Sequence, residues 1–246
     1  MDMQLADGIY FLNFAPWRLC VRLLLVSMIV AAAAVTAFAT DNELTPAEKA
    51  EGWILLFDGK GTAGWKNNTV KPVAAKIEEG ALNPHGSGGY VLVYDKPFGD
   101  FVLKCDVKMD QPFCNSGIFV RIGDLKDPVQ TGIETQVSTD KEVDMHSFGA
   151  LYDLVTPSKN ASHGPNQWDA VEIRCEGPKV TVTVNGEKVA SLNCDEWPDA
   201  GKRPDGTKTK YAKAVKDFPR KGYLGVQDHD YNEWFKNIKL KELPAK

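Results

Sequence analysis

The stretch CNSGIFVRIGDLKDPVQTGIETQV, Cys114–Val137, contains two short runs in which apolar and polar residues alternate. Successive side chains of a β-strand point to opposite faces, so residues two apart share a face. One face of the first run consists of Ile118, Val120 and Ile122. The opposite face carries Arg121, and the polar face of the second run carries Glu134 and Gln136. The pattern predicts two strands that bury one face and bring these three polar side chains together on the other.

The rest of the chain repeats this pattern in short stretches that Gly, Pro, Asn or Asp separate. The stretches lie at residues 81–95, 100–109, 116–123, 132–139, 170–177, 179–192, 222–227 and 235–243. Because no helical period lies between them, they predict an all-β fold, an antiparallel two-sheet sandwich or a barrel. Asn185 and Gly186 predict a type I′ hairpin turn. Thr45 and Pro46 predict one short N-terminal helix.

Two long stretches interrupt the strands. Residues 140–167 are rich in loop-forming residues, and residues 196–220 are dense in Lys, Pro and Gly. Long irregular insertions in a compact β domain are more often functional than idle. Solvated surface loops are the alternative, above all for the Lys-rich stretch.

The N-terminus differs in kind from the rest of the chain. Arg18 and Arg22 precede an apolar run, residues 23–35, which ends in Ala37-Phe38-Ala39. A positive flank, a short apolar core and an Ala-x-Ala end are typical of a secretory signal. We therefore predict a signal peptide at residues 1–39, a single domain at 40–246, and export to the periplasm or the extracellular space. A membrane anchor is the alternative, but a span usually needs about 20 apolar residues.

The composition is that of an ordinary globular protein. Of 246 residues, 43% are hydrophobic and 25% are charged, and the net charge is −4. This weak acidity gives no case for a nucleic-acid partner. The sequence has no Gly-rich phosphate loop, no His-Glu-x-x-His and no Cys pair at zinc spacing. Cys105 and Cys175 alternate in phase with core residues, which favours buried thiols; a Cys175–Cys194 disulfide is the alternative.

Seven motifs follow one another between about residues 52 and 243: LFDGKGTAGW, FGDFVLKCDVKM, NSGIFVRIG, GIETQV, GALYDLVTPSKNA, QWDAVEIRCEGPKVTVTVNGEKV and RKGYLGVQDHDYNEWFKNIKLKEL. Together they resemble the 3-keto-disaccharide hydrolase domain family, also described as the 3-keto-glycoside 1,2-lyase/hydratase domain. The resemblance implies a concanavalin- or laminarinase-like jelly roll whose concave face holds sugars. It also implies exported bacterial proteins that act on glycosides oxidised at carbon 3.

A carbonyl at C3 acidifies the hydrogen at C2 and places the C1 substituent in the β position. Removal of the C2 proton gives an enolate that expels the leaving group, and addition of water completes a net hydrolysis. Such a site needs a base, an acid for the leaving oxygen and an electrophile for the enolate. It does not need the two flanking carboxylates of an ordinary glycosidase.

Three residues are the catalytic candidates. Glu134 is the first candidate for the base or for a metal ligand, and a structural ion pair with Arg121 is its alternative. Arg121 is suited to the enolate oxygen because its guanidinium is always charged. His229 follows a predicted strand and is suited to proton shuttling. A structural histidine is the alternative.

Five further residues are candidates for binding the substrate: Asn115, Gln136, Tyr152, Gln227 and Trp65. Amides suit hydroxyl groups, and aromatic faces suit pyranose rings, although large aromatic residues are first of all packing residues. A divalent metal held by His85, His146 or His163 together with Glu134 and His229 would stabilise an enolate. No ligand spacing in the sequence identifies such a site.

These inferences favour an exported enzyme that takes an oligosaccharide or glycoside substrate and cleaves 3-keto-glycosides by elimination and hydration. A non-catalytic sugar-binding module is the first alternative, because fold alone does not decide function. Conventional glycoside hydrolysis is the second. Gln136 speaks against it, because a retaining glycosidase of this fold would carry a second carboxylate at that position of the strand.

Overall fold

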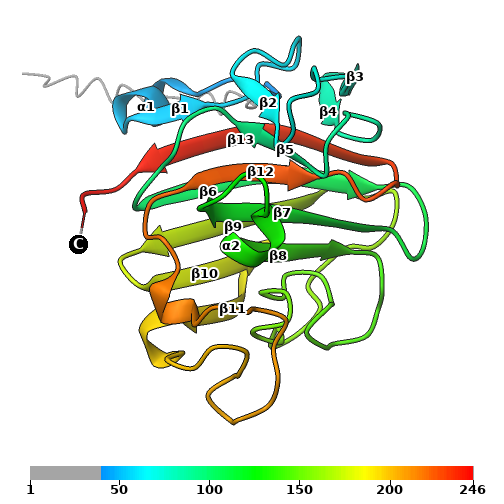
Figure 1. Ribbon diagram of the computed structural model, residues 1–246. Coiled ribbons are helices and arrows are strands. Elements are labelled where there is room, and N and C mark those ends of the chain that lie inside the picture. Colours follow the sequence, from blue (N-terminus) through cyan, green and yellow to red (C-terminus); the bar gives the residue numbers. More distant parts are fainter. Residues whose placement is uncertain (1–39, 246) are drawn as a thin grey trace, which may run out of the picture. The chain divides into compact units, whose positions relative to one another are not determined.

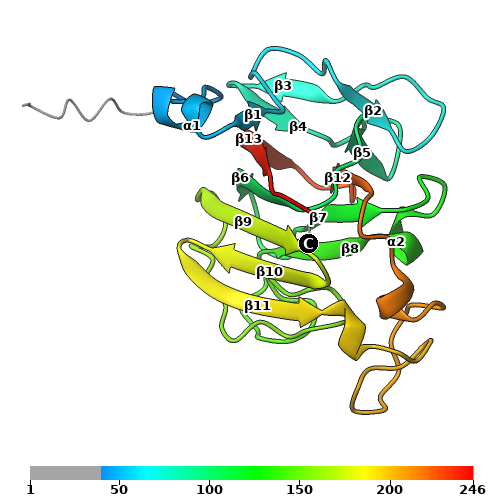
Figure 2. The ribbon, with the colours of Figure 1, turned by 90° about the vertical axis from the view of Figure 1, so that its left-hand side faces the viewer.

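Two antiparallel β-sheets face each other in the computed structural model, which describes residues 40–245 (Figures 1 and 2). One sheet has the strand order β11-β10-β9-β6-β13-β4-β3, and β1 pairs with β13 at its side. The other has the order β2-β5-β12-β7-β8. The prediction of an all-β, antiparallel two-sheet jelly-roll sandwich is confirmed.

The strands of the larger sheet are β1 (Trp53–Leu55), β3 (Lys76–Glu78), β4 (Ala81–Asn83), β6 (Phe101–Met109), β9 (Asp169–Glu176), β10 (Lys179–Val184), β11 (Glu187–Asn193) and β13 (Glu233–Glu242). Those of the five-stranded sheet are β2 (Trp65–Asn67), β5 (Val91–Tyr94), β7 (Asn115–Ile122), β8 (Ile133–Ser138) and β12 (Tyr223–Gln227). The helical elements are α1 (Pro46–Ala50), α2 (Pro128–Thr131), η1 (Cys194–Glu196) and η2 (Val215–Asp217).

The core lies between the sheets because alternate residues of each strand are apolar. In β6 the residues at every second position from Phe101 to Met109 are buried, whereas Lys104, Asp106 and Lys108 are partly exposed. The cysteines follow the same rule: Cys105, Cys114, Cys175 and Cys194 are buried free thiols. Their burial raises the pKa of the thiols, that of Cys175 to about 12.

A bulge in β7 breaks the alternation that the sequence predicts. Arg121 has φ +55°, and the register between β7 and β12 shifts at this point. Ile122 therefore packs with Phe119 on the outer face, not with the inward-facing Ile118. A Cβ atom at Gly222 would lie 2.5 Å from the Arg121 carbonyl carbon, so only glycine allows the two backbones to approach this closely.

The bulge turns Arg121 toward the interior of the sandwich. Its side chain is fully buried, and Nη2 donates to Asp100 Oδ1 over 3.0 Å. Asp100 Oδ2 accepts the backbone N–H of Gly177 in the turn between β9 and β10. The prediction that Arg121 shares a face with Glu134 is therefore wrong, because one residue in the left-handed region reverses the phase of the strand.

Two local predictions are confirmed. Asn185 and Gly186 both have positive φ, as a type I′ turn requires, and they join β10 to β11. Thr45 caps α1 in a reciprocal capping box with Glu48.

The predicted signal peptide, residues 1–39, lies outside the described residues. Within residues 40–245, none of the helices has the length and hydropathy needed to span a membrane.

Candidate functional site

The candidate site lies on the outer face of the five-stranded sheet, and Glu134 on β8 is at its centre. Glu134 is 4% exposed. Across the strand pair, a Cβ atom at Gly117 would lie only 2.5 Å from Glu134 Oε1. The missing side chain at Gly117 therefore provides the space that the carboxyl group occupies.

Each carboxyl oxygen of Glu134 has a polar partner. Oε2 lies 3.2 Å from Lys210 Nζ, and Oε1 accepts from Gln227 Nε2 over 3.3 Å. Burial raises the pKa of Glu134, whereas the ammonium group of Lys210 acts in the opposite direction; the pKa ends above its usual range. A carboxyl group whose pKa lies above its usual range is better suited to accepting and returning a proton.

Lys210 reaches the sheet from the long segment 196–220, and Asp153 fastens that segment. Asp153 Oδ2 accepts the backbone N–H of Lys210 and, over 3.0 Å, the hydroxyl of Thr209. The guanidinium of Arg203 pairs with Asp153 Oδ1 and donates to its carbonyl oxygen. These contacts hold the Lys210 ammonium over the Tyr152 ring, 4.1 Å from its centroid.

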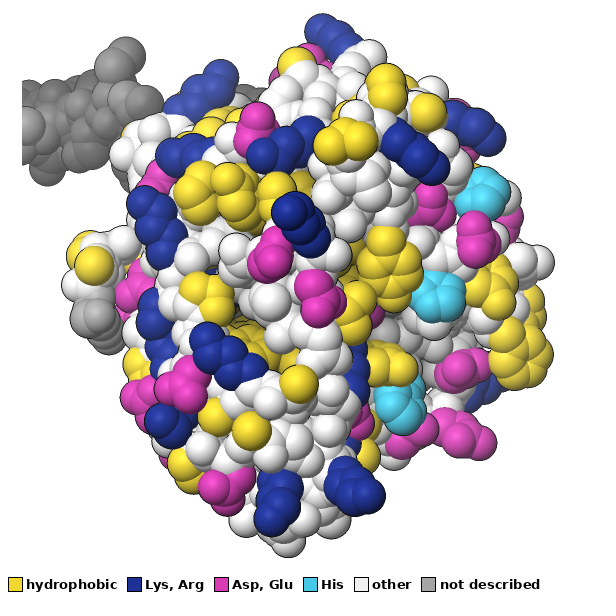
Figure 3. Space-filling model, viewed as in Figure 1, with side chains coloured by type: hydrophobic (Ala, Val, Ile, Leu, Met, Phe, Trp, Pro, Cys, Tyr) yellow, Lys and Arg dark blue, Asp and Glu magenta, His cyan; other side chains and the backbone are white. Residues whose placement is uncertain are grey.

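A chain of amide groups runs along the sheet from Gln136 to His229. Gln136 Nε2 donates to Asn115 Oδ1 over 2.8 Å, and Asn115 Nδ2 lies 3.2 Å from His229 Nε2. Because an amide nitrogen only donates, His229 Nε2 is the acceptor and carries no proton in this arrangement. Figure 3 shows histidine side chains gathered along one side of this face, next to hydrophobic and acidic groups.

Tyr90 closes the group from the loop before β5. Gln227 Nε2 donates to the Tyr90 hydroxyl as well as to Glu134, and the ring centroid of Tyr90 lies 6.1 Å from that of His229. Burial, together with the nearby charge of Glu134, raises the pKa of Tyr90 to about 12. The phenol is therefore protonated at neutral pH and able to donate.

The structure brings most of the predicted site residues together. Those that share this connected group are Glu134, His229, Asn115, Gln136, Gln227 and Tyr152. Arg121 is in the interior with Asp100. Trp65 is also in the core, where Nε1 donates to the Leu56 carbonyl over 2.8 Å and its ring meets Tyr94 edge-on. The prediction that Trp65 binds substrate is wrong in its placement, because β2 turns this ring between the sheets.

Sequence reasoning missed Tyr90 and Lys210. Tyr90 directly precedes β5, where alternation puts it in phase with the inward-facing Leu92, so the strand pattern gave no signal for it. Lys210 is one of many lysines in a loop, and nothing in the local sequence distinguishes it from a solvated one.

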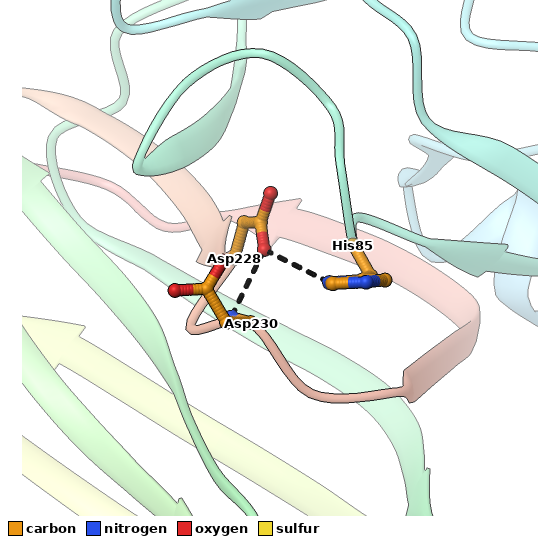
Figure 4. A group of neighbouring side chains, drawn as sticks. All are labelled: His85, Asp228 and Asp230. Atoms are coloured by element: carbon orange, nitrogen blue, oxygen red, sulfur yellow. Dashed lines mark hydrogen bonds and ion pairs between the residues drawn. The ribbon is translucent and has the colours of Figure 1, made fainter.

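Three of the histidines proposed as metal ligands, His85, His146 and His163, have partners other than Glu134. His163 Nδ1 lies 3.2 Å from Asp169 Oδ1, and the His146 ring packs on the Tyr152 ring. Among the described residues, the group with metal-binding atoms within 4.8 Å of one another is His85, Asp228 and Asp230. Asp228 lies between the other two (Figure 4), where its carboxylate also accepts the backbone N–H groups of Gly86 and Ser87. It therefore joins two loops and is not part of the Glu134 group.

The profile of the 3-keto-alpha-glucoside-1,2-lyase-like domain family matches residues 52–241. The chain belongs to this family. Among its relatives, a 3-keto-disaccharide hydrolase of Bacteroides thetaiotaomicron is 26% identical over 231 residues, which cover 79% of each chain. The similarity of the chain to this enzyme supports a carbohydrate-related function for the chain.

Two crystal structures from Parabacteroides distasonis, each of a candidate glycosyl hydrolase, resemble this 3-keto-alpha-glucoside-1,2-lyase-like domain. One superposes with a TM-score of 0.68 at 26% identity and covers 78% of this chain and 99% of its own. The other has a TM-score of 0.67 at 28% identity and covers 83% of this chain and 100% of its own. The fold is therefore shared along nearly the whole length of these proteins.

Proposed function

We propose that this protein cleaves 3-keto-glycosides by removing the C2 proton, expelling the C1 substituent and adding water. The observation that carries the proposal is the buried Glu134 carboxyl group, which has a raised pKa, lies against the Lys210 ammonium and is surrounded by hydroxyl-binding amides. Membership of the lyase-like family and similarity to a 3-keto-disaccharide hydrolase support the reaction class.

In the elimination step, Glu134 takes the C2 proton and the C–H electron pair becomes the C2–C3 double bond of an enolate. The Lys210 ammonium stabilises the negative oxygen at C3. The enolate then re-forms the carbonyl and breaks the C1–O bond, which leaves a C1–C2 double bond. Tyr90 gives its phenolic proton to the departing oxygen.

In the hydration step, the unprotonated Nε2 of His229 takes a proton from water while the hydroxide adds to C1. Glu134 returns its proton to C2, and the imidazolium of His229 passes its proton to the Tyr90 phenolate. Each group thereby regains its starting state. In this scheme Asn115 and Gln136 bind sugar hydroxyls and hold the ring over Glu134.

The test uses the purified protein with a 3-keto-disaccharide and its unoxidised parent, each with and without a chelator. We expect cleavage of the keto form alone, and a fall in kcat of about 10²-fold or more in Glu134→Gln, in line with the usual contribution of a general base. Glu187→Gln, on an exposed end of β11, is the matched control. Binding of either sugar without turnover would instead identify a sugar-binding module, and cleavage of the unoxidised parent would identify a conventional glycosidase.

We also propose export, on the composition of residues 18–39. Expression of the full chain in a bacterium followed by N-terminal sequencing of the periplasmic fraction tests this. We expect a mature protein that begins at Thr40; an uncleaved protein in the membrane fraction would favour the anchor.

A further inference from the structure

A cavity lies beside the candidate site, next to the end of β8 and the start of β7. Its volume is about 510 Å³. Among the residues that line it are Pro112, Phe113, Asp140, Glu142, Asp144 and His146. None of these residues has a role in the chemistry proposed above.

Two of the residues that line the cavity lie next to residues of the candidate site. On one wall, Phe113 lies two residues before Asn115, which contacts His229. Thr139, at the end of β8, accepts the backbone N–H of Cys114 over 2.9 Å and so holds this wall against the sheet. On the other wall, the His146 ring lies 4.8 Å from the Tyr152 ring, which carries the Lys210 ammonium on its face. The cavity therefore lies next to the group of residues around Glu134.

Phe113 presents its ring to solvent. The residue is 77% exposed, although phenylalanine is among the residues most often buried. Its backbone has φ +64°, a conformation that non-glycine residues seldom adopt. An exposed aromatic ring that lines a cavity offers a flat surface on which another ring can stack.

The charged residues that line the cavity are mainly acidic. They are three carboxylates, Asp140, Glu142 and Asp144, and one lysine, Lys141. The backbone N–H of His146 lowers the pKa of Asp144, which is therefore ionised at neutral pH. An anionic ligand would be repelled here.

We propose that this cavity is the leaving-group subsite and that it takes an uncharged ring, such as a sugar or an aryl aglycone, stacked on Phe113. The proposal rests on the proposed function, since it assigns the C1 substituent of the 3-keto-glycoside to the cavity. It narrows the substrate class to glycosides with a ring-shaped, non-anionic leaving group.

The experiment compares 4-nitrophenyl and methyl 3-keto-glucosides, in both anomeric forms, with wild-type protein and Phe113→Ala. Each variant is compared with wild type on the same substrate, so the intrinsic reactivity of the leaving group cancels. We expect kcat/KM for the nitrophenyl substrate to fall about 3- to 10-fold, the equivalent of one lost stacking contact, and that for the methyl substrate to change less than about 2-fold. Phe113→Trp, which keeps an aromatic ring, should retain the wild-type preference for the nitrophenyl over the methyl substrate.

Val143→Ala is the control, because Val143 is an exposed apolar residue that does not line the cavity, in the neighbouring loop after β8. A second comparison uses 4-carboxyphenyl 3-keto-glucoside, which should be a poorer substrate than the nitrophenyl compound until Glu142→Gln and Asp144→Asn are introduced. Equal losses on the nitrophenyl and methyl substrates in Phe113→Ala, or no loss on either, would overturn the subsite.

The same variants are tested for binding of unoxidised 4-nitrophenyl and methyl glucosides by calorimetry. If wild type turns over no keto substrate, the proposed function has failed, and the subsite is then judged on binding alone. Weaker binding of the nitrophenyl glucoside to Phe113→Ala supports it, whereas equal binding to both proteins refutes it.

Discussion

Glu134 and Glu233 are both buried carboxyl groups, but their surroundings differ. Glu134 lies against the Lys210 ammonium. Glu233 is fully buried at the start of β13, where the charged groups near it are carboxylates. Burial, with Asp228 nearby, raises the pKa of Glu233 to about 9. Glu134 is therefore placed to exchange a proton with a substrate, whereas Glu233 destabilises the folded protein at neutral pH.

Glu233→Gln should stabilise the protein at pH 7 to 8.5. The folded protein keeps Glu233 protonated up to about pH 9, whereas the unfolded chain loses that proton near the ordinary value of 4.5. Unfolding therefore releases a proton between these values, and the free energy of unfolding falls as the pH rises through this window. We expect a gain of about 1–3 kcal/mol for the variant at pH 8, because the amide has no proton to lose on unfolding, and little gain at pH 4. Urea unfolding at both pH values measures this gain. The same difference in free energy of unfolding between variant and wild type at pH 4 and pH 8 would show that Glu233 does not have a raised pKa.

Lys210→Met should move the pH profile of the enzyme. Lys210 lowers the pKa of Glu134 against the larger effect of burial, so its removal raises that pKa further. We expect the acidic limb of the kcat/KM profile to shift to higher pH, and kcat to fall about 10- to 100-fold because the enolate loses its cation. Lys213→Met, on an exposed position of the same segment, is the control. An unshifted limb would show that Lys210 does not act on Glu134.

At the scale of elements, the site joins a rigid sheet to a segment with little regular structure. Strands β7, β8 and β12 position the amides and Glu134 through backbone pairing. The segment 196–220 positions Lys210 through Asp153 and its hydrogen bonds. The sheet therefore fixes one half of the site, and Asp153, together with Gln130 on the Lys210 backbone, fixes the other.

Asp153→Asn should weaken catalysis without unfolding the protein. The amide loses the charge that holds Arg203 and accepts fewer hydrogen bonds from the segment, so Lys210 is placed less well. We expect kcat to fall about 10-fold, in line with the loss from a misplaced catalytic group, and the melting temperature to change by only a few degrees. We also expect limited proteolysis within residues 196–220 to be faster in this variant than in wild type. Asp205→Asn, an exposed carboxylate of the same segment, should change neither property.

The β7 bulge leads to a prediction about Arg121. Because Arg121 is fully buried and paired with Asp100, Arg121→Met leaves that carboxylate without its guanidinium partner. We expect a loss of about 3–5 kcal/mol in the free energy of unfolding, with kcat/KM per folded molecule unchanged. Chemical denaturation and active-site-normalised kinetics separate the two. A large loss of activity in a fully folded variant would return Arg121 to the catalytic group.

At the scale of the whole molecule, alternation of residue types was enough to predict an antiparallel all-β fold, a sandwich or a barrel, and the family resemblance implied the two-sheet jelly roll. Alternation was also enough to bring Glu134, Gln136 and Asn115 to one face, because the period of two holds along β8 and the first half of β7. It failed at Arg121, where a single left-handed residue resets the phase. Sequence reasoning could not find Lys210, because its position depends on contacts with Asp153, 57 residues away along the chain.

All four described cysteines lie inside the sandwich as unpaired thiols. Oxidants cannot reach them while the chain is folded, and their high pKa values leave little reactive thiolate. The vulnerable moment is therefore renaturation, when the sulfur atoms are exposed to one another. We expect recovery from guanidinium to be near complete with a reductant and markedly poorer in air, with mispaired bridges visible by non-reducing electrophoresis. Purification from inclusion bodies should keep dithiothreitol present until the sheets have closed.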